Sequence, residues 1–199
     1  MIFRLSEKLS VKIKSGTLAT MPLDENPFAD WSAGLVLVGR TPYILLTNTK
    51  SLYSTVLPGK GATDEKTFIK RALSSIREFM DADGQVGVYE RLVAPVSGSV
   101  QFAKALNRSV TGSMNDMTKH AAFWLAAGDV SPIEIGSRLK GIPMSALKHD
   151  RLNPRFSTGC VPGNGGQGQI VKASDYPPRF ASSVYVGSAS SHFTSPEGP

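Results

Sequence analysis

Cysteine is almost absent from this 199-residue chain, and it has no apolar run of membrane length. The single Cys160 cannot form an internal disulfide, and the scattered His120, His149 and His192 have no metal-ligand spacing. No apolar run approaches the ~18 residues that a membrane span needs. The first eight residues also lack the apolar core of a signal peptide. We therefore expect a cytoplasmic protein with no metal, no cofactor and no membrane contact.

Charge is also scarce, because only 19% of the residues are charged. The 22 basic and 16 acidic residues leave a net charge of +6, with no block of consecutive lysines and arginines. This composition excludes a coiled coil, a collagen-like rod and a polyelectrolyte tail. Diffuse positive charge permits phosphate contacts without requiring them, so a protein partner and a nucleic-acid partner both stay open.

Short apolar runs bounded by turn residues predict strands at residues 2–5, 34–38, 43–47, 52–57 and 99–103. The second and third runs flank a Gly-Arg-Thr-Pro turn, as in a hairpin. Both are almost continuously apolar, so both faces of the sheet should be covered.

Helical periodicity is clearest over residues 63–83, where apolar residues form one wide stripe. A second helix is predicted to begin at Ser113, whose hydroxyl can cap it with help from Asp116, and to end at Gly128. A third helix is predicted over residues 131–141, where a serine cap, a proline and a glutamate follow one another.

These elements predict an α+β fold, with a small, mostly antiparallel sheet covered by two or three helices over residues 1–150. The remaining residues, 151–199, have a different composition. Glycine (7), proline (6) and serine (8) make up 21 of these 49 residues. Such a segment offers little apolar surface to offset the entropy of ordering it, so we expect a flexible, mostly disordered tail.

The densest polar cluster runs from Asn107 to Asp116, between a predicted strand and the predicted helix start. Helix N-termini present free amides and a partial positive charge, which suit an anion. Arg108 could add a two-point fork to a phosphate or carboxylate. In the structural alternative, Ser113 and Asp116 only cap the helix, and Arg108 pairs with Asp30 or Asp116. The candidate binding residues are Asn107, Arg108, Ser109, Ser113, Asn115, Asp116 and Trp31.

Two further residues have competing interpretations. Trp31 precedes the hairpin, where an indole either packs in the core and donates to a backbone carbonyl or lines a pocket. His120 lies one turn into the predicted second helix, where a nucleophile–base pair with Ser109 or Ser113 is conceivable. No acid at a suitable spacing supports that pair, and no Gly-x-Ser-x-Gly elbow is present.

Four groups of residues are typical of one bacterial protein family. They are Asp30-Trp31-x-Ala33-x-Leu35; Thr47-Asn48-x-x-Ser51-Leu52 with Leu57-Pro58-Gly59; Asn107-Arg108-Ser109-x-x-Gly112-Ser113-Met114-Asn115-Asp116; and Arg138-Leu139-x-x-Ile142-Pro143-Met144-x-x-Leu147-Lys148. Through them, roughly residues 1–150 resemble domain of unknown function 6933. The resemblance implies a domain boundary, and it implies no activity because the family has none established.

These observations favour a non-catalytic binding module that uses the turn at residues 107–116, with a phosphate-bearing or protein partner. One alternative is an enzyme at the same turn, of the phosphoryl-transfer or nuclease-like hydrolase type, with Asp116 or His120 as base and Arg108 steadying the anion. The other alternative is a purely structural hydrogen-bond network without a ligand.

Truncation after Asp150 tests the assignment of the tail. Because the removed residues are poor in apolar surface, the shortened chain should keep its thermal midpoint almost unchanged. Differential scanning calorimetry of both chains makes the comparison. A fall of more than several degrees would show that the tail packs on the domain.

Overall fold

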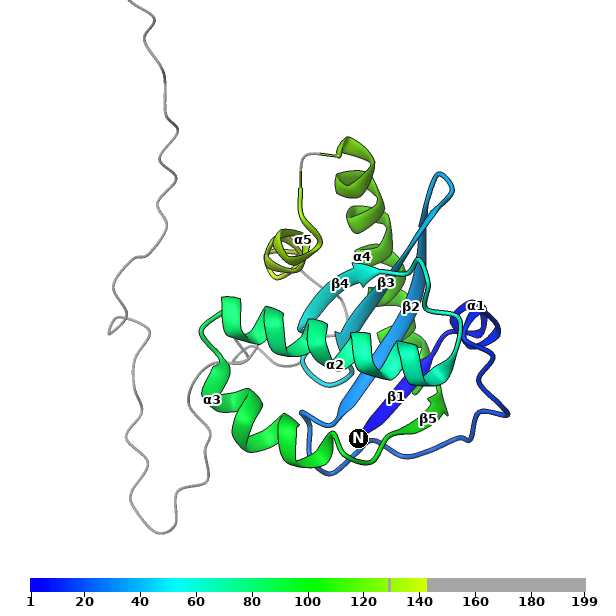
Figure 1. The fold of residues 1–199 in the computed structure, drawn as a ribbon, viewed down its shortest axis with the longest axis vertical. Helices are drawn as coiled ribbons and strands as arrows, with labels where there is room; N and C mark the ends of the chain where they lie inside the picture. The colour runs from blue at the N-terminus through cyan, green and yellow to red at the C-terminus, as the bar shows by residue number, and fades with distance from the viewer. Residues whose placement is uncertain (129, 143–199) are drawn as a thin grey trace, which may run out of the picture. The chain divides into compact units, whose positions relative to one another are not determined.

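The computed structural model describes residues 1–128 and 130–142, and its centre is one five-stranded sheet with the order β4-β3-β2-β1-β5 (Figure 1). The strands are β1 (Ile2–Leu5), β2 (Asp30–Val38), β3 (Thr41–Asn48), β4 (Ser54–Pro58) and β5 (Gln101–Lys104). All five predicted strands are present, and the α+β class is confirmed. The tail predicted at residues 151–199 lies outside the described residues.

The prediction of a mostly antiparallel sheet is wrong, because the sheet is mixed. β2, β3 and β4 form an antiparallel meander, whereas β1 is parallel to both of its neighbours, β2 and β5. Parallel neighbours are joined by crossovers rather than by tight turns. No local pattern in the sequence shows that the short first and fifth strands lie side by side.

The structure has five helices in the described residues, two more than the three predicted, because α1 and α3 were not expected. They are α1 (Glu7–Lys12), α2 (Glu65–Ala82), α3 (Val86–Val88), α4 (Arg108–Ala127) and α5 (Pro132–Leu139). A π-helical turn, η1 (Tyr89–Val93), and a 3₁₀ turn, η2 (Ala94–Val96), follow α3. α2 and α5 occupy the predicted places, whereas the six residues of α1 were missed because so short a helix has little periodicity.

The helix predicted to begin at Ser113 begins at Arg108 instead, about a turn and a half earlier. Asn107 is the cap, since its side-chain oxygen accepts from the Val110 amide at 2.9 Å and its carbonyl accepts from the Thr111 hydroxyl at 2.9 Å. Asparagine is among the best helix N-caps, so the helix can begin after Asn107 without a serine cap. The segment 107–116 is therefore the first half of α4 rather than a turn.

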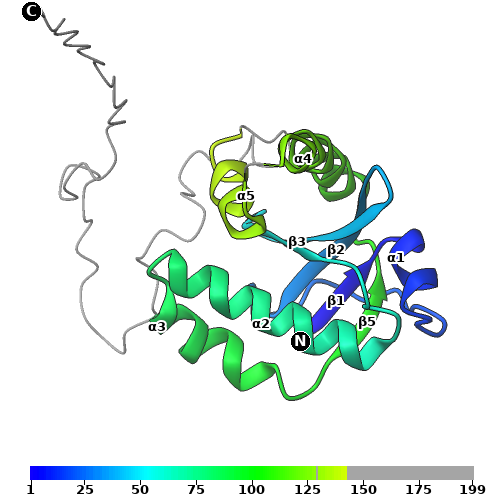
Figure 2. The same cartoon turned by 45° about the horizontal axis from the view of Figure 1, so that its top comes forward.

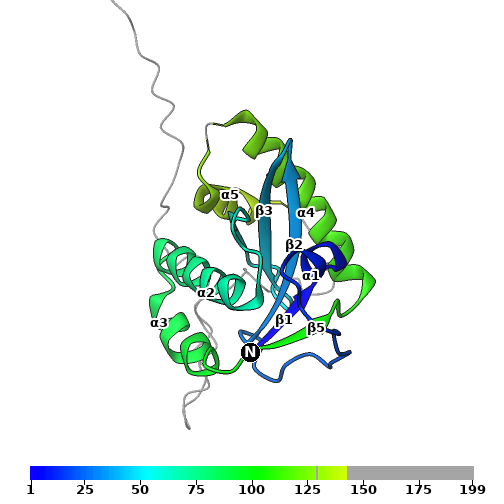
Figure 3. The ribbon, with the colours of Figure 1, turned by 45° about the vertical axis from the view of Figure 1, so that its right-hand side comes forward.

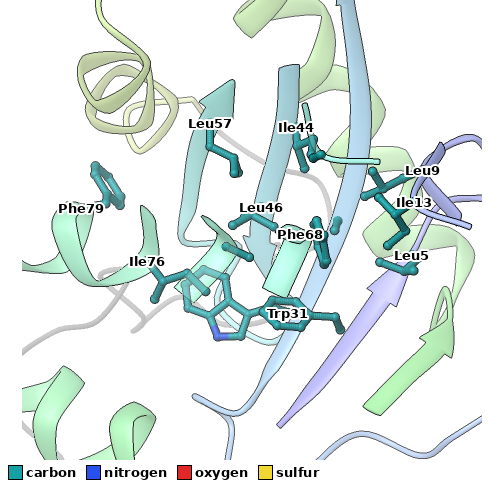
Figure 4. Close-up of a cluster of buried hydrophobic side chains, with 14 of the residues drawn as sticks. Leu5, Leu9, Ile13, Trp31, Ile44, Leu46, Leu57, Phe68, Ile76 and Phe79 are labelled. Atoms are coloured by element: carbon teal, nitrogen blue, oxygen red, sulfur yellow. The ribbon is translucent and has the colours of Figure 1, made fainter. Parts of the chain in front are cut away.

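Helices cover both faces of the sheet, as the apolar hairpin strands predicted. α2 and the short helical run after it lie on one face, and α4 lies on the other (Figures 1 and 3). Phe68, Ile76 and Phe79 of α2 pack in one apolar cluster with strand residues that include Trp31 and Leu46 (Figure 4). A second cluster joins Val36, Leu45 and Val56 of the strands to Met117 of α4 and Ile135 of α5.

Asn48 organises the turn between β3 and β4. Its side-chain oxygen accepts from the amide and the hydroxyl of Ser51, at 3.0 and 2.9 Å. Its side-chain nitrogen donates to the carbonyls of Pro27 and Asp30, at 2.8 and 3.2 Å. The buried Asn48 thus ties this turn to the start of β2, which gives the Thr-Asn-x-x-Ser motif a structural role.

α5 approaches the sheet so closely that one of its residues must be glycine. A Cβ on Gly136 would lie 2.8 Å from the Phe79 ring and 2.9 Å from the Ser54 carbonyl oxygen.

The far end of α5 is fixed by an ion pair between Lys140 and Asp83, and the Asp83 carboxylate also accepts from the Tyr53 hydroxyl at 3.1 Å. Burial raises the pKa of Tyr53, and the neighbouring carboxylate adds to the effect, so this phenol remains a donor.

Membrane-spanning segments were searched for within the described residues. No helix there is both long and apolar enough to cross a bilayer.

Two helical glycines give a paired test of this packing. Gly136→Ala should lower the free energy of unfolding by about 1–3 kcal/mol, because its methyl group would overlap a buried ring and a carbonyl. In Gly112→Ala, within α4, the new methyl group would meet no atom within 4 Å. That variant should gain about 0.5–1 kcal/mol from helix propensity alone. Urea denaturation measures both, and an unchanged Gly136→Ala would contradict the close approach of α5.

Candidate functional site

A cleft of about 810 Å³ opens beside the first half of α4. Its floor is the middle of β2, at Ala33, Gly34 and Leu35. One wall is α4, and the other consists of the start of α1 and the residues that follow β5. We call this hollow the α4 cleft.

The α4 cleft exists because neighbouring strands end at different places. Leu5, the last residue of β1, is paired with Ala33 on one side and with Lys104, the last residue of β5, on the other. β2 continues to Val38 without a neighbour on that side. In open α/β sheets, ligands bind where the carboxyl ends of parallel strands meet, and β1, β2 and β5 form the parallel part of this sheet.

A buried ion pair supports the cleft from below. Arg4 is 2% exposed and Asp30 is fully buried. The Arg4 Nε and Nη2 atoms donate to the two carboxylate oxygens of Asp30, at 2.8 and 2.7 Å. Further bonds from Nη1 and Nη2 reach the carbonyls of Met21, Lys104 and Pro22, at 3.0, 3.4 and 2.6 Å. A guanidinium has five N–H donors, and all five are used, so Arg4 lines the cleft without offering it a free donor.

The structural alternative, in which Arg108 pairs with Asp30 or Asp116, is wrong about this pairing. Asp30 pairs with Arg4, and Asp116 pairs with Lys119 at 3.1 Å on the exposed surface of α4. Arg108 is exposed at the first position of the helix, and it forms no ion pair with any residue that the structure describes.

The remaining candidates on α4 divide into three environments. Asn115 lines the cleft. Ser113, expected to be the helix cap, is fully buried within the helix, and its hydroxyl has no hydrogen-bond partner within the described part of the chain. Ser109 and Asp116 are exposed and outside the lining of the cleft, as is Arg108.

Trp31 lies apart from the other candidates, in the apolar cluster on the α2 face of the sheet. It is fully buried, and its indole N–H donates to the Phe28 carbonyl at 2.8 Å. Its ring packs edge-to-face on Tyr53, with the ring centroids 6.5 Å apart. The structure therefore gives Trp31 the core role and does not bring it to the α4 cleft.

The two bases considered for catalysis, His120 and Asp116, are exposed on α4. The ring of the exposed His120 lies beside Trp124, with centroids 5.8 Å apart. The Asp116 carboxylate is held by Lys119. Within residues 1–128 and 130–142, no group of three or more histidine, cysteine, aspartate or glutamate side chains could hold a metal ion.

Sequence reasoning missed most of the α4 cleft. Ser6, Lys8 and Lys104 line it although no motif includes them, and Met114 approaches its floor. The Met114 methyl group lies 3.5 Å from the point where a Cβ on Gly34 would be. Ser6 also has a buried hydroxyl without a partner among the described residues. The one available signal was an arginine within the apolar strand Ile-Phe-Arg-Leu, since a charge in such a place needs a buried partner.

Comparison with known proteins gives one match. The family model described as Domain of unknown function (DUF6933) matches residues 2–155, and the chain belongs to this family. No curated protein and no solved structure matches the chain.

Removal of one partner of the buried ion pair tests its structural role. Asp30→Ala should lower the free energy of unfolding by about 3–5 kcal/mol, because it leaves the Arg4 guanidinium buried and uncompensated. Asp116→Ala is the matched control, since it breaks an ion pair whose side chains are 78% and 58% exposed and should change stability little. Urea denaturation of both variants gives the comparison. Equal losses of unfolding free energy in the two variants would contradict the structural role of the buried pair.

Proposed function

We propose that this protein is a non-catalytic binding domain that holds a small, partly apolar ligand in the α4 cleft. The observation that supports this most strongly is the position of the cleft at the carboxyl ends of the parallel strands β1 and β5. Its volume of about 810 Å³ suits a small molecule, since small-molecule sites measure about 300–1,000 Å³.

The walls indicate the chemistry of the ligand. Leu35, Val110 and Met114 present apolar surface, while Thr118 and Asn115 present hydrogen-bonding groups. A mostly apolar cavity with a few polar groups binds a ligand through burial and orients it through hydrogen bonds. We therefore propose a ligand with an apolar body and a polar end.

The charge near the cleft favours an anionic polar end. Lys8 and Lys104 line the cleft with one carboxylate, Glu7, and the Arg4 charge is balanced by Asp30. The N-terminal turn of α4 adds its partial positive charge. Arg108 lies between Leu106 and Val110, which both line the cleft, so we include Arg108 and its neighbour Ser109 as contacts to a carboxylate or phosphate at the rim.

Binding has more support than catalysis. Lining residues in the described part of the chain include hydroxyls, an amide and cations, with Glu7 as the single carboxylate and no histidine or cysteine. These groups supply hydrogen bonds and charge rather than a paired nucleophile and base. The purely structural alternative fits Asn107, which caps the helix, and Ser113, which is buried within it.

Blocking the cleft with one side chain tests the proposal. Asn115→Trp should abolish binding of small carboxylate-bearing and phosphate-bearing fragments, because the indole would enter the cleft that Asn115 lines. The matched control is Asp116→Trp, on the adjacent exposed residue outside the lining. Protein-observed NMR measures binding through the amide shifts of Ala33, Gly34 and Thr118.

The proposal predicts that these three amides shift with fragments in the wild-type chain and in Asp116→Trp, but not in Asn115→Trp. Arg108→Lys keeps the positive charge but loses the planar guanidinium. It should therefore weaken the binding of anionic fragments without affecting the binding of neutral ones. Fragments that shift none of the three amides in the wild-type chain, or that bind both tryptophan variants equally, would refute the site.

A further inference from the structure

A second hollow lies at the free edge of the sheet, on the side opposite β5. This hollow, the β4 cleft, measures about 900 Å³. Its floor is the edge strand β4, one wall is a face of α2, and the other wall is the start of α5. Both helices pack against β4, and Figure 2 shows α5 and α2 next to each other.

Positive charge is concentrated in the β4 cleft. Lys60, Lys66, Lys70 and Arg71 line it, against a single carboxylate, Glu78. The four ion pairs between described residues involve none of these five side chains. The cleft thus has four cations in one concave surface, whereas the charge of the chain as a whole is diffuse.

Nearby acids outside the lining have other partners. Asp64 caps α2 by accepting from the amide and the hydroxyl of Thr67, both at 2.8 Å. A carboxylate oxygen of Glu65 accepts from the Gly16 amide at 3.3 Å. Arg71 is held in place by a bond from Nη1 to the Lys60 carbonyl at 2.5 Å, which leaves its other nitrogens for a ligand.

The placement of these cations opposes the local preferences of a helix. Lys66 lies in the first turn of α2, where the helix dipole favours negative charge. Lys66 and Lys70 are also like charges four residues apart, an arrangement that destabilises a helix. Residues that break such local rules without a packing reason are expected at functional sites.

The opposite wall adds more positive potential. Ser131, Pro132 and Ile133, the cap and first two residues of α5, line the cleft. The Ser131 hydroxyl accepts from the Glu134 amide at 3.2 Å, and Pro132 has no amide hydrogen. The partial positive charge at the start of α5 faces the same hollow as the cations of α2. The Glu134 carboxylate in this turn is outside the lining and accepts from Arg138 at 2.8 Å.

Other features of the lining narrow the class of ligand. None of the described residues that line it is aromatic, so they form no platform on which nucleic-acid bases could stack. Pro58 lacks the amide that strand addition would need, and α5 lies against the Ser54 carbonyl, so the β4 edge does not suit an added peptide strand. The Ser74 hydroxyl accompanies the cations.

We propose that the β4 cleft is a binding site for a small anion with two or more phosphate groups, which Lys66, Lys70 and Arg71 hold across from the start of α5. This site is separate from the α4 cleft and does not depend on the function proposed for that cleft.

Calorimetric titration of the full chain with tripolyphosphate in about 150 mM NaCl tests the site, since at that ionic strength diffuse surface attraction is largely screened. Lys66→Gln combined with Lys70→Gln should weaken binding at least tenfold. Lys50→Gln combined with Lys119→Gln removes the same charge from exposed residues outside the cleft and should change binding less than twofold. Thermal melts verify that each variant folds. If the double variant does not fold, Lys70→Gln alone replaces it and should weaken binding at least threefold.

Three further titrations assign the ligand class and separate the two clefts. ATP should bind with the affinity of tripolyphosphate, because only the phosphates are recognised. Asn115→Trp should leave tripolyphosphate binding unchanged, so failure of one proposed site is distinguishable from failure of the other. Equal losses in the two double variants, or no binding by the wild-type chain below about 1 mM, would overturn the proposal. A 15-nucleotide single strand that binds more than tenfold tighter than tripolyphosphate would also overturn it.

Discussion

The buried pair of Arg4 and Asp30 is the constraint on which the parallel half of this fold depends. Transfer of two charges out of water costs several kcal/mol per ion, and only complete hydrogen bonding offsets that cost. Here the guanidinium uses every donor, on the Asp30 carboxylate and on three carbonyls from the loop before β2 and from the end of β5. One side chain of β1, the strand between β2 and β5, thereby fixes both of these neighbours and the long loop between β1 and β2.

The two halves of the sheet produce two different hollows. In the parallel half, β1 and β5 end early while β2 continues, so a mostly apolar cleft opens beneath α4. In the antiparallel half, the edge strand β4 is flanked by the start of α5 and by α2, whose facing residues are rich in cations. Because these hollows differ in charge and lie at separate places on one sheet, a ligand suited to one is poorly suited to the other.

The first half of α4 combines structural and exposed residues within one motif. Asn107 begins the helix, and Val110 and Ser113 are buried beneath it. Asn115 lines the α4 cleft, and it is the only residue of the predicted site that does so. Gly112 is exposed, and nothing in the described structure explains a glycine there.

The sequence by itself determined the elements that depend on neighbouring residues. The five strands follow from short apolar runs, and α2 and α5 follow from periodicity and from their caps, Asp64 and Ser131. The start of α4 was misplaced because Ser113 fits a cap pattern, whereas in the structure Asn107 caps the helix and Ser113 is buried within it. The mixed sheet, the pairing of Arg4 with Asp30 and both clefts were decided by tertiary structure. Each depends on residues far apart in the chain, which meet only when crossovers bring separate strands and helices together.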